Sequence, residues 1–527
     1  MRRRTREAGP FDVRWEPGLS VPAADGSPLL TDHYAPVTDE PVPTLLIRSA
    51  YGRGFPWNWL YGVTFAEHGF HVIVQSIRGT GGSGGDFHLW RHEAADGQAT
   101  VEWLREQEWF TGAFATIGPS YLSFVQWSLG LDPPPEWGAA VLQVPVHDFY
   151  DAFYADRQCA FRLELALVSG TAFYHQSAGT VAYTRALLRL ARHLKGAVTR
   201  LPLLDSYRRA LGGRRPEFEE WLSHPYQDDL FWAGSDTGPA ADRMSVPTSV
   251  VTGWHDLALR QALRQYARMR EAGHEPTLLI GPWTHTSPFD KGWPEVFPDA
   301  LEHLRVHLLG EGKRTTKVRV HTGNEWRELA EWPPPSTATP FFLHPDGLRE
   351  TPAEAGRTTW RYDPADPTPS IGGQLQSRTA GAVDNKKLEA RADVRTFTSG
   401  PLAQVVEIIG TTTATLYLSN DTGHFDVFAR LCDVDADGRS VNVCDGLVRL
   451  TPDHQDEDLA EVDLGPIAHR FATGHRIRLQ LSGGAHPRFA RNYGTGEPLA
   501  TATRLVATTT TVHHDSVHPS ALMLPVV

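Results

Sequence analysis

Thr116-Ile117-Gly118-Pro119-Ser120-Tyr121-Leu122-Ser123 is the stretch that decides the fold of this 527-residue chain. Residues 113–117 have the pattern of a strand, and from Tyr121 onward the apolar residues recur with helical spacing. A serine at the apex of a sharp strand-to-helix turn has the geometry of a nucleophile elbow, in which the hydroxyl projects clear of the sheet. The general elbow reads G-x-S-x-G, but here Leu122 occupies the second glycine position and Ser123 is the next small residue. Because a serine that only caps a helix fits the same pattern, the rest of the chain must supply a base, an acid and an oxyanion donor.

Strand and helix signals alternate on both sides of this stretch. Short apolar runs separated by helical patterns occupy residues 44–47, 71–75, 139–142, 248–252 and 276–280. The alternation predicts an α/β fold with a mostly parallel sheet that is covered by helices on both faces.

Two later motifs end neighbouring strands of the predicted sheet, namely Gly253-Trp254-His255-Asp256 and Gly281-Pro282-Trp283-Thr284-His285. Because ligand chemistry in such a sheet gathers at the carboxyl ends of the strands, we expect Ser120, Asp256 and His285 to lie together. The chain order serine, aspartate, histidine is that of the α/β-hydrolases. We therefore predict that His285 is the general base for Ser120 and that Asp256 orients its ring.

An oxyanion hole needs two donors near the serine. The backbone N–H of Tyr121, which follows the nucleophile, is the first predicted donor. The strand at 44–47 is followed by Arg48-Ser49-Ala50-Tyr51-Gly52 rather than by an HGGG-type loop. The hydroxyl of Tyr51 is therefore the second predicted donor.

The remaining parts of the chain differ in character. Residues 146–242 carry helical patterns without strand signals, which predicts a helical cap inserted into the α/β domain. After Gly310 short strands and turn residues replace the helices, which predicts a β-sandwich of the jelly-roll type. The expected domains are an α/β-hydrolase domain in two parts (1–145 and 243–312), a helical cap (146–242) and a sandwich (313–527).

These motifs resemble those of the CocE/NonD hydrolase family, which is related to cocaine esterase, α-amino acid ester hydrolases and X-Pro dipeptidyl peptidases. The family's G-x-S-Y-x-G, G-W-x-D and G-P-W-x-H motifs match residues 118–123, 253–256 and 281–285, and its oxyanion tyrosine matches Tyr51. Similarity continues through 75–85, 362–373, 433–438 and 474–478. The resemblance implies an α/β-hydrolase domain, a helical cap and a C-terminal jelly roll that together form a serine hydrolase.

The chain also departs from the family pattern. Ser123 replaces a glycine, Ser76 an aspartate and Ala50 a proline, and Ser169 stands where relatives often carry a tryptophan. We expect an acyl pocket that differs from one for a cocaine-like aromatic ester. The predicted substrate-binding residues are Phe153, Phe161, Ser169, Trp254 and Trp283.

The acidic residues of the first cap segment help to decide whether the predicted substrate is an ester or an amide. Asp148, Asp151, Asp156 and Glu164 are sparse among aromatic and aliphatic residues, which favours an apolar acyl pocket over a cage for a substrate ammonium group. We predict hydrolysis of a small carboxylic ester. The alternatives are an amide or peptide hydrolase of the X-Pro dipeptidyl peptidase type and an acyl-transferring or non-catalytic relative.

The composition of the chain limits the kinds of partner that it can bind. A net charge of −12 and a pI near 6.0 argue against nucleic acid, and no apolar run is long enough to cross a bilayer. Three cysteines are too few for a disulfide framework, and no apolar segment follows the arginines at 2–4, so we predict a cytoplasmic protein.

His303 and His307 lack a third metal ligand nearby, and residues 433–438 read as a hairpin turn rather than a calcium loop. No metal or cofactor is predicted, and a homo-oligomer is left open.

Overall fold

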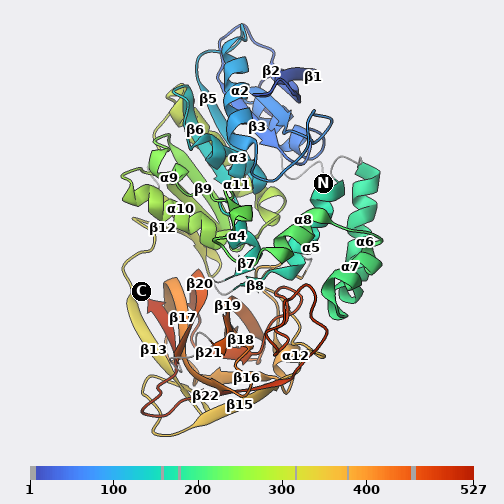
Figure 1. The fold of residues 1–527 in the computed structure, drawn as a ribbon. Helices are drawn as coiled ribbons and strands as arrows, with labels where there is room; N and C mark the ends of the chain where they lie inside the picture. Colours follow the sequence, from blue (N-terminus) through green and yellow to red (C-terminus); the bar gives the residue numbers. More distant parts are fainter. Residues whose placement is uncertain (1–7, 156–158, 176–179, 315–316, 377–378, 453–458) are drawn as a thin grey trace.

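The computed structural model describes residues 8–155, 159–175, 180–314, 317–376, 379–452 and 459–527. Three parts are visible in Figure 1: a large mixed sheet flanked by helices, a group of cap helices at one side, and a pair of antiparallel sheets at the other end of the molecule. This is the predicted architecture of an α/β-hydrolase domain, a helical cap and a C-terminal sandwich.

The large sheet has ten strands, and those from β4 to β11 in the spatial order run parallel, as the alternation of strand and helix signals predicted. Across the sheet the order is β1 (Val13–Pro22), β2 (Pro28–Pro36), β4 (His71–Ser76), β3 (Thr44–Ser49), β5 (Phe114–Pro119), β6 (Trp137–Gln143), β9 (Thr248–His255), β10 (Thr277–Thr284), β11 (Val318–Thr322) and β12 (Glu325–Leu329).

Helices bury both faces of this sheet. Alternate residues of one strand enter different cores. Leu46 belongs to the core that includes residues of α2 (Glu93–Arg105), α3 (Tyr121–Leu129) and α10 (Leu259–Glu271), whereas Leu45 belongs to the core that includes residues of α1 (Thr64–Ala66) and α11 (Trp293–Leu304). Such two-sided burial is why the strands read as continuous apolar runs in the sequence.

The cap follows β6. Its elements are α4 (Phe149–Phe153), the short ribbon β7 (Tyr154–Ala155) and β8 (Ala160–Phe161), α5 (Leu163–His175), α6 (Thr180–Thr199), α7 (Leu203–Leu211) and α8 (Pro216–Ser223), and α9 (Ala240–Arg243) leads back to the sheet. The prediction of a helical segment is confirmed, with β7 and β8 as an addition. Short apolar faces of these helices form a second core that also includes Tyr121 and Phe124 at the elbow.

The sandwich consists of two antiparallel sheets whose apolar residues share one core. The first contains β14 (Gly347–Arg349), β13 (Thr337–His344), β23 (Ala521–Val526), β17 (Val406–Asn420), β22 (Thr508–His513) and β15 (Arg357–Tyr362), with β20 (Leu459–Phe471) paired to β17. The second contains β16 (Val394–Thr398), β21 (Arg476–Ser482), β18 (Phe425–Val434) and β19 (Ser440–Leu450), and α12 (Lys386–Glu389) precedes it. The predicted turn at Asp435–Gly438 does join β18 to β19.

One predicted boundary is wrong. The sandwich was expected to begin at 313, yet β11 pairs in parallel with β10, and β12 pairs with β11, so both strands extend the large sheet. The first sandwich strand is β13, which begins at Thr337. The alternating pattern of residues 318–322 suits an edge strand of either sheet, and only the long-range pairing with β10 decides between them.

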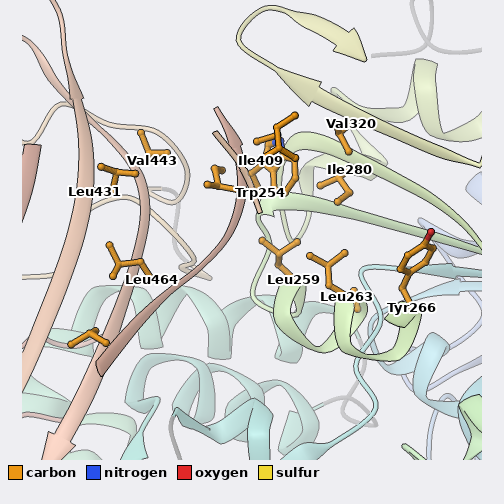
Figure 2. Packing of buried hydrophobic residues seen from close by; sticks show 14 of the residues in the cluster. Trp254, Leu259, Leu263, Tyr266, Ile280, Val320, Ile409, Leu431, Val443 and Leu464 are labelled. Atoms are coloured by element: carbon orange, nitrogen blue, oxygen red, sulfur yellow. The ribbon is translucent and has the colours of Figure 1, made fainter. Parts of the chain in front are cut away.

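The α/β domain and the sandwich share a continuous apolar core. Figure 2 shows Trp254, Leu259 and Leu263 in one cluster with Ile409 and Leu464 from the sandwich. This contact fixes the end of β9 and the start of α10, and both positions bear on the site described next. In the described ranges no helix is long and apolar enough to cross a membrane, and the three cysteines are free thiols.

Candidate active site

Ser120 sits at the sharp turn between β5 and α3. Its φ of 56° and ψ of −117° are unusual for a residue with a side chain, and they aim the residue away from the sheet. Gly118 is needed here because a Cβ at that position would lie 2.5 Å from the Cβ of Leu122. The first glycine of the elbow pattern is therefore explained by the close approach of α3 to β5.

The structure brings Ser120, His285 and Asp256 into one hydrogen-bonded chain. His285 Nε2 lies 3.0 Å from Ser120 Oγ, and His285 Nδ1 lies 2.6 Å from Asp256 Oδ1. Asp256 is fully buried, and its other oxygen accepts the hydroxyl of Thr252 at 2.7 Å. With the backbone N–H of Ala258 donating to Oδ1 at 3.1 Å, the carboxylate is held in one orientation.

The glycines of the two later motifs make room for one tryptophan. Trp283 lies against Gly253 and Gly281, where an added Cβ would come within 2.4 Å of the backbone or ring atoms of Trp283. The register between β9 and β10 shifts after Gly281, just before His285. The two motifs thus interlock the strand ends that carry the aspartate and the histidine.

The hydroxyl of Tyr51 faces the same serine. Its neighbours there are the side chain of Ser120 and the backbone of Tyr121. Although 36% of the residue is exposed, burial around the hydroxyl raises the pKa of Tyr51 to about 12, and these two neighbours lower it only in part. Tyr51 therefore stays protonated and is a hydrogen-bond donor at neutral pH.

The side chain of Tyr121 anchors the first turn of α3. Its hydroxyl donates to Glu93 and accepts the backbone N–H of Trp90 at 3.2 Å. Burial raises the pKa of the Glu93 carboxyl. No local sequence signal identified Glu93. An acid in the first turn of a helix is ordinarily exposed to solvent, where its negative charge interacts favourably with the helix dipole.

A small cavity opens beside Ser120, with a volume of about 70 Å³. The predicted residues that line it are Tyr51, Ser120, Tyr121, His285, Phe153 and Ser169. The other lining residues are Val146, Phe149, Ala152, Leu165, Phe173, Leu257, Ala258 and Gln261. The cavity is apolar apart from the reacting groups, Ser169 and Gln261.

Three predicted substrate-binding residues lie elsewhere. Phe161 is buried in the cap, where its ring contacts Tyr154 and Phe218. Trp254 donates its indole N–H to the carbonyl of His321 at 2.6 Å and packs toward the sandwich, and Trp283 packs against Trp326. The tryptophans were mispredicted because a motif fixes sequence position, whereas the face of the strand end decides where a side chain points.

The whole chain has counterparts among known proteins. The X-Pro dipeptidyl-peptidase (S15 family) model matches residues 25–287, and the X-Pro dipeptidyl-peptidase C-terminal non-catalytic domain model matches residues 303–523. Cocaine esterase from Rhodococcus sp. is 28% identical over 568 aligned positions, which cover 97% of this chain and 98% of that protein. The chain belongs to the CocE/NonD family of serine hydrolases.

Solved structures agree with this CocE/NonD fold. An α-amino acid ester hydrolase superposes with a TM-score of 0.82 at 21% identity, covering 99% of this chain and 98% of that one. An aminopeptidase from a marine sediment Thaumarchaeota archaeon superposes with a TM-score of 0.81 at 19% identity, covering 100% and 98%. At these identities the likeness bears on the fold alone.

One departure from the CocE/NonD pattern has a structural explanation. Ser123 is fully buried, and its hydroxyl donates to the carbonyl of Gly118 at 2.6 Å and accepts the backbone N–H of Gln143 at 3.1 Å. The serine therefore ties α3 to both β5 and β6, directly behind the elbow.

Proposed function

We propose that this chain hydrolyses small, neutral carboxylic esters through an acyl-enzyme on Ser120. The observation that supports the proposal is the unbroken chain from Ser120 Oγ to His285 at 3.0 Å and from His285 to Asp256 at 2.6 Å. Such a chain is the arrangement required for a serine hydroxyl to attack a carbonyl carbon while a neighbouring base takes its proton.

In the first half-reaction His285 takes the proton of Ser120 as the oxygen attacks the ester carbonyl. Asp256 stabilises the resulting imidazolium, and the Tyr51 hydroxyl and the Tyr121 N–H donate to the developing oxyanion. The protonated His285 then returns the proton to the departing alkoxide. In the second half-reaction a water molecule, deprotonated by His285, attacks the acyl-enzyme and releases the acid.

The walls of the Ser120 cavity favour a neutral acyl group. An enzyme that binds a peptide by its free ammonium group needs a desolvated carboxylate close to the serine. Among the described residues that line this cavity there is no aspartate or glutamate. Asp148 and Asp151 line a different cavity on the far side of α4, and Asp156 lies outside the described residues.

A side-by-side measurement of kcat/KM tests the substrate class. We expect 4-nitrophenyl acetate and butyrate to be cleaved far faster than Gly-Pro 4-nitroanilide at neutral pH, after subtraction of the rate of the Ser120→Ala variant. A clear preference for the anilide would replace the esterase assignment with that of a dipeptidyl peptidase.

Location and assembly stay predictions. The free thiols suit a reducing compartment, so the cytoplasm remains the predicted location, and cell fractionation tests it. Whether the chain forms a homo-oligomer is left to a measurement of its mass in solution.

A further inference from the structure

A second, much larger cavity lies where the cap, α10 and the sandwich meet. Its volume is about 650 Å³, which is in the usual range for sites that bind small molecules. Asp151 and Arg162 line it from the cap, Arg260 and Arg264 from α10, and Asp463 and Arg488 from the sandwich. All three parts of the fold therefore contribute charged side chains to one space.

Most of these charges are already paired. Arg260 binds Asp463, Arg264 lies 2.8 Å from Asp151, and Arg488 binds Asp445. Two further acids line the cavity: Asp148 accepts the backbone N–H of Asp151 at the start of α4, and Glu461 is exposed.

Arg162 differs from the other arginines. It lies between β8 and α5, and its backbone N–H donates to the carbonyl of Phe153. Within the described residues its guanidinium has no hydrogen-bond or ion-pair partner, and its Nε is buried without one. The residue is half-buried, so part of a charged guanidinium without a described partner is withdrawn from water, and arginine does not relieve that cost by deprotonating at neutral pH.

Three other arginines and one aspartate act on the charge of Arg162. Burial lowers the pKa of the Arg162 guanidinium to about 10, and repulsion from Arg488, Arg260 and Arg264 acts in the same direction against the attraction of Asp151. The planar fork of a guanidinium matches carboxylate and phosphate oxygens in geometry.

We propose that this interdomain cavity is a binding site for a small molecule that carries a carboxylate or phosphate group, and that Arg162 holds the anionic group. The site is separate from the one at Ser120. On α4, Phe149, Ala152 and Phe153 line the Ser120 cavity, whereas Tyr150 and Asp151 line the interdomain cavity. The same division holds on α10, where Gln261 faces one cavity and Arg260 and Arg264 the other.

Thermal unfolding of the full chain tests the proposal, with inorganic phosphate and citrate as probes and sodium chloride at equal ionic strength as the reference. Phosphate stabilises most proteins because it is excluded from their surface, so a rise in Tm of the wild type alone is not evidence of a site. The informative quantity is the difference in the rise of Tm between the wild type and the variants. We expect phosphate or citrate to raise the Tm of the wild type by about 2 °C more than that of Arg162→Met. The matched control Arg349→Met, which removes an exposed arginine paired with Asp346 in the sandwich, should respond as the wild type does.

Equal responses in all three proteins would overturn the proposal. If Arg162→Met does not fold, titration calorimetry on the wild type decides: saturable heat with phosphate or citrate supports the site, and its absence overturns it. A further experiment tests whether the two sites are separate: the thermal unfolding is repeated after Ser120 has been blocked by a fluorophosphonate. The anion response should persist in the blocked protein, and its loss would place the anion at Ser120 and overturn the second site.

Discussion

The two cavities on either side of α4 and α10 differ in the charge of their walls. The one at Ser120 has a volume of about 70 Å³ and mostly apolar walls, whereas the interdomain cavity has a volume of about 650 Å³ and adds four arginines and five acids to its apolar and aromatic residues. Neighbouring residues serve different cavities, as Phe149 and Tyr150 do. The two faces of each helix therefore present different side chains to the two cavities.

The largest expected effect comes from removing the nucleophile. Ser120→Ala should lower kcat for an aryl ester by about 10⁴-fold or more while leaving the Tm nearly unchanged, because the side chain points into the cavity. Steady-state kinetics measure kcat, and thermal unfolding measures the Tm. The control Ser128→Ala changes a buried serine of α3 that does not line the cavity, and its kcat should stay within a few-fold of wild type. Near-normal activity of Ser120→Ala would move the reaction out of this cavity.

Loss of the Tyr51 hydroxyl should have the next largest effect. Tyr51→Phe is expected to reduce kcat by about 10²- to 10³-fold with little change in KM, because the hydroxyl acts on charge that develops in the transition state. The matched control is Tyr61→Phe, since the Tyr61 hydroxyl donates to Gln143 at 2.5 Å inside the core. The control should lose stability but keep its kcat at a temperature where it is folded. If both variants lost activity only in proportion to their stability, Tyr51 would be a packing residue.

The apolar wall should set the acyl chain length. Leu165 lines the Ser120 cavity, so Leu165→Ala enlarges it and should shift kcat/KM toward hexanoyl over acetyl esters by about tenfold. Leu163, on the same helix, is buried in the cap core instead. Leu163→Ala should cost about 2 to 5 kcal/mol of stability and leave the chain-length preference as in the wild type. An unchanged preference in Leu165→Ala would show that the acyl group binds elsewhere.

The smallest effect is expected behind the elbow. Ser123→Ala removes hydrogen bonds to β5 and β6 and should lower the free energy of unfolding by about 1 to 2 kcal/mol. Ser128→Ala changes a buried serine of the same helix whose hydroxyl donates to the carbonyl of Phe124, and it should change the free energy of unfolding by less than about 1 kcal/mol. Urea unfolding measures both variants. Equal effects would mean that Ser123 does not reinforce the elbow.

The fold and the reacting groups could be predicted because their signals are local. The elbow, the strand ends at Asp256 and His285, and the alternation of strands and helices are all visible in short windows of sequence. The antiparallel strands β1 and β2 were not predicted. Most of β1 is exposed and carries no apolar pattern, whereas β2 is mostly buried but has the polar residues 31–33 in its middle. The walls of the two cavities could not be predicted either. Phe153 and Phe161 look alike in the sequence, and only the packing of the cap sends the first to the cavity and the second to the core.

Arg162 shows the same limit for charge. A single arginine before an apolar helix reads as a surface residue, and its position among Arg260, Arg264 and Arg488 depends on the docking of the sandwich against α10. Asp148 and Asp151 were two of the four acids visible in the first cap segment, but which cavity they line could not be read from their spacing.

Mass spectrometry after treatment with a fluorophosphonate probe tests most directly that Ser120 is an activated nucleophile in the apolar cavity. Folded wild-type protein should gain one adduct, which peptide mapping places on Ser120 and which disappears in Ser120→Ala and after thermal unfolding. An adduct on another serine, or labelling of the Ser120→Ala variant at the same rate, would contradict it.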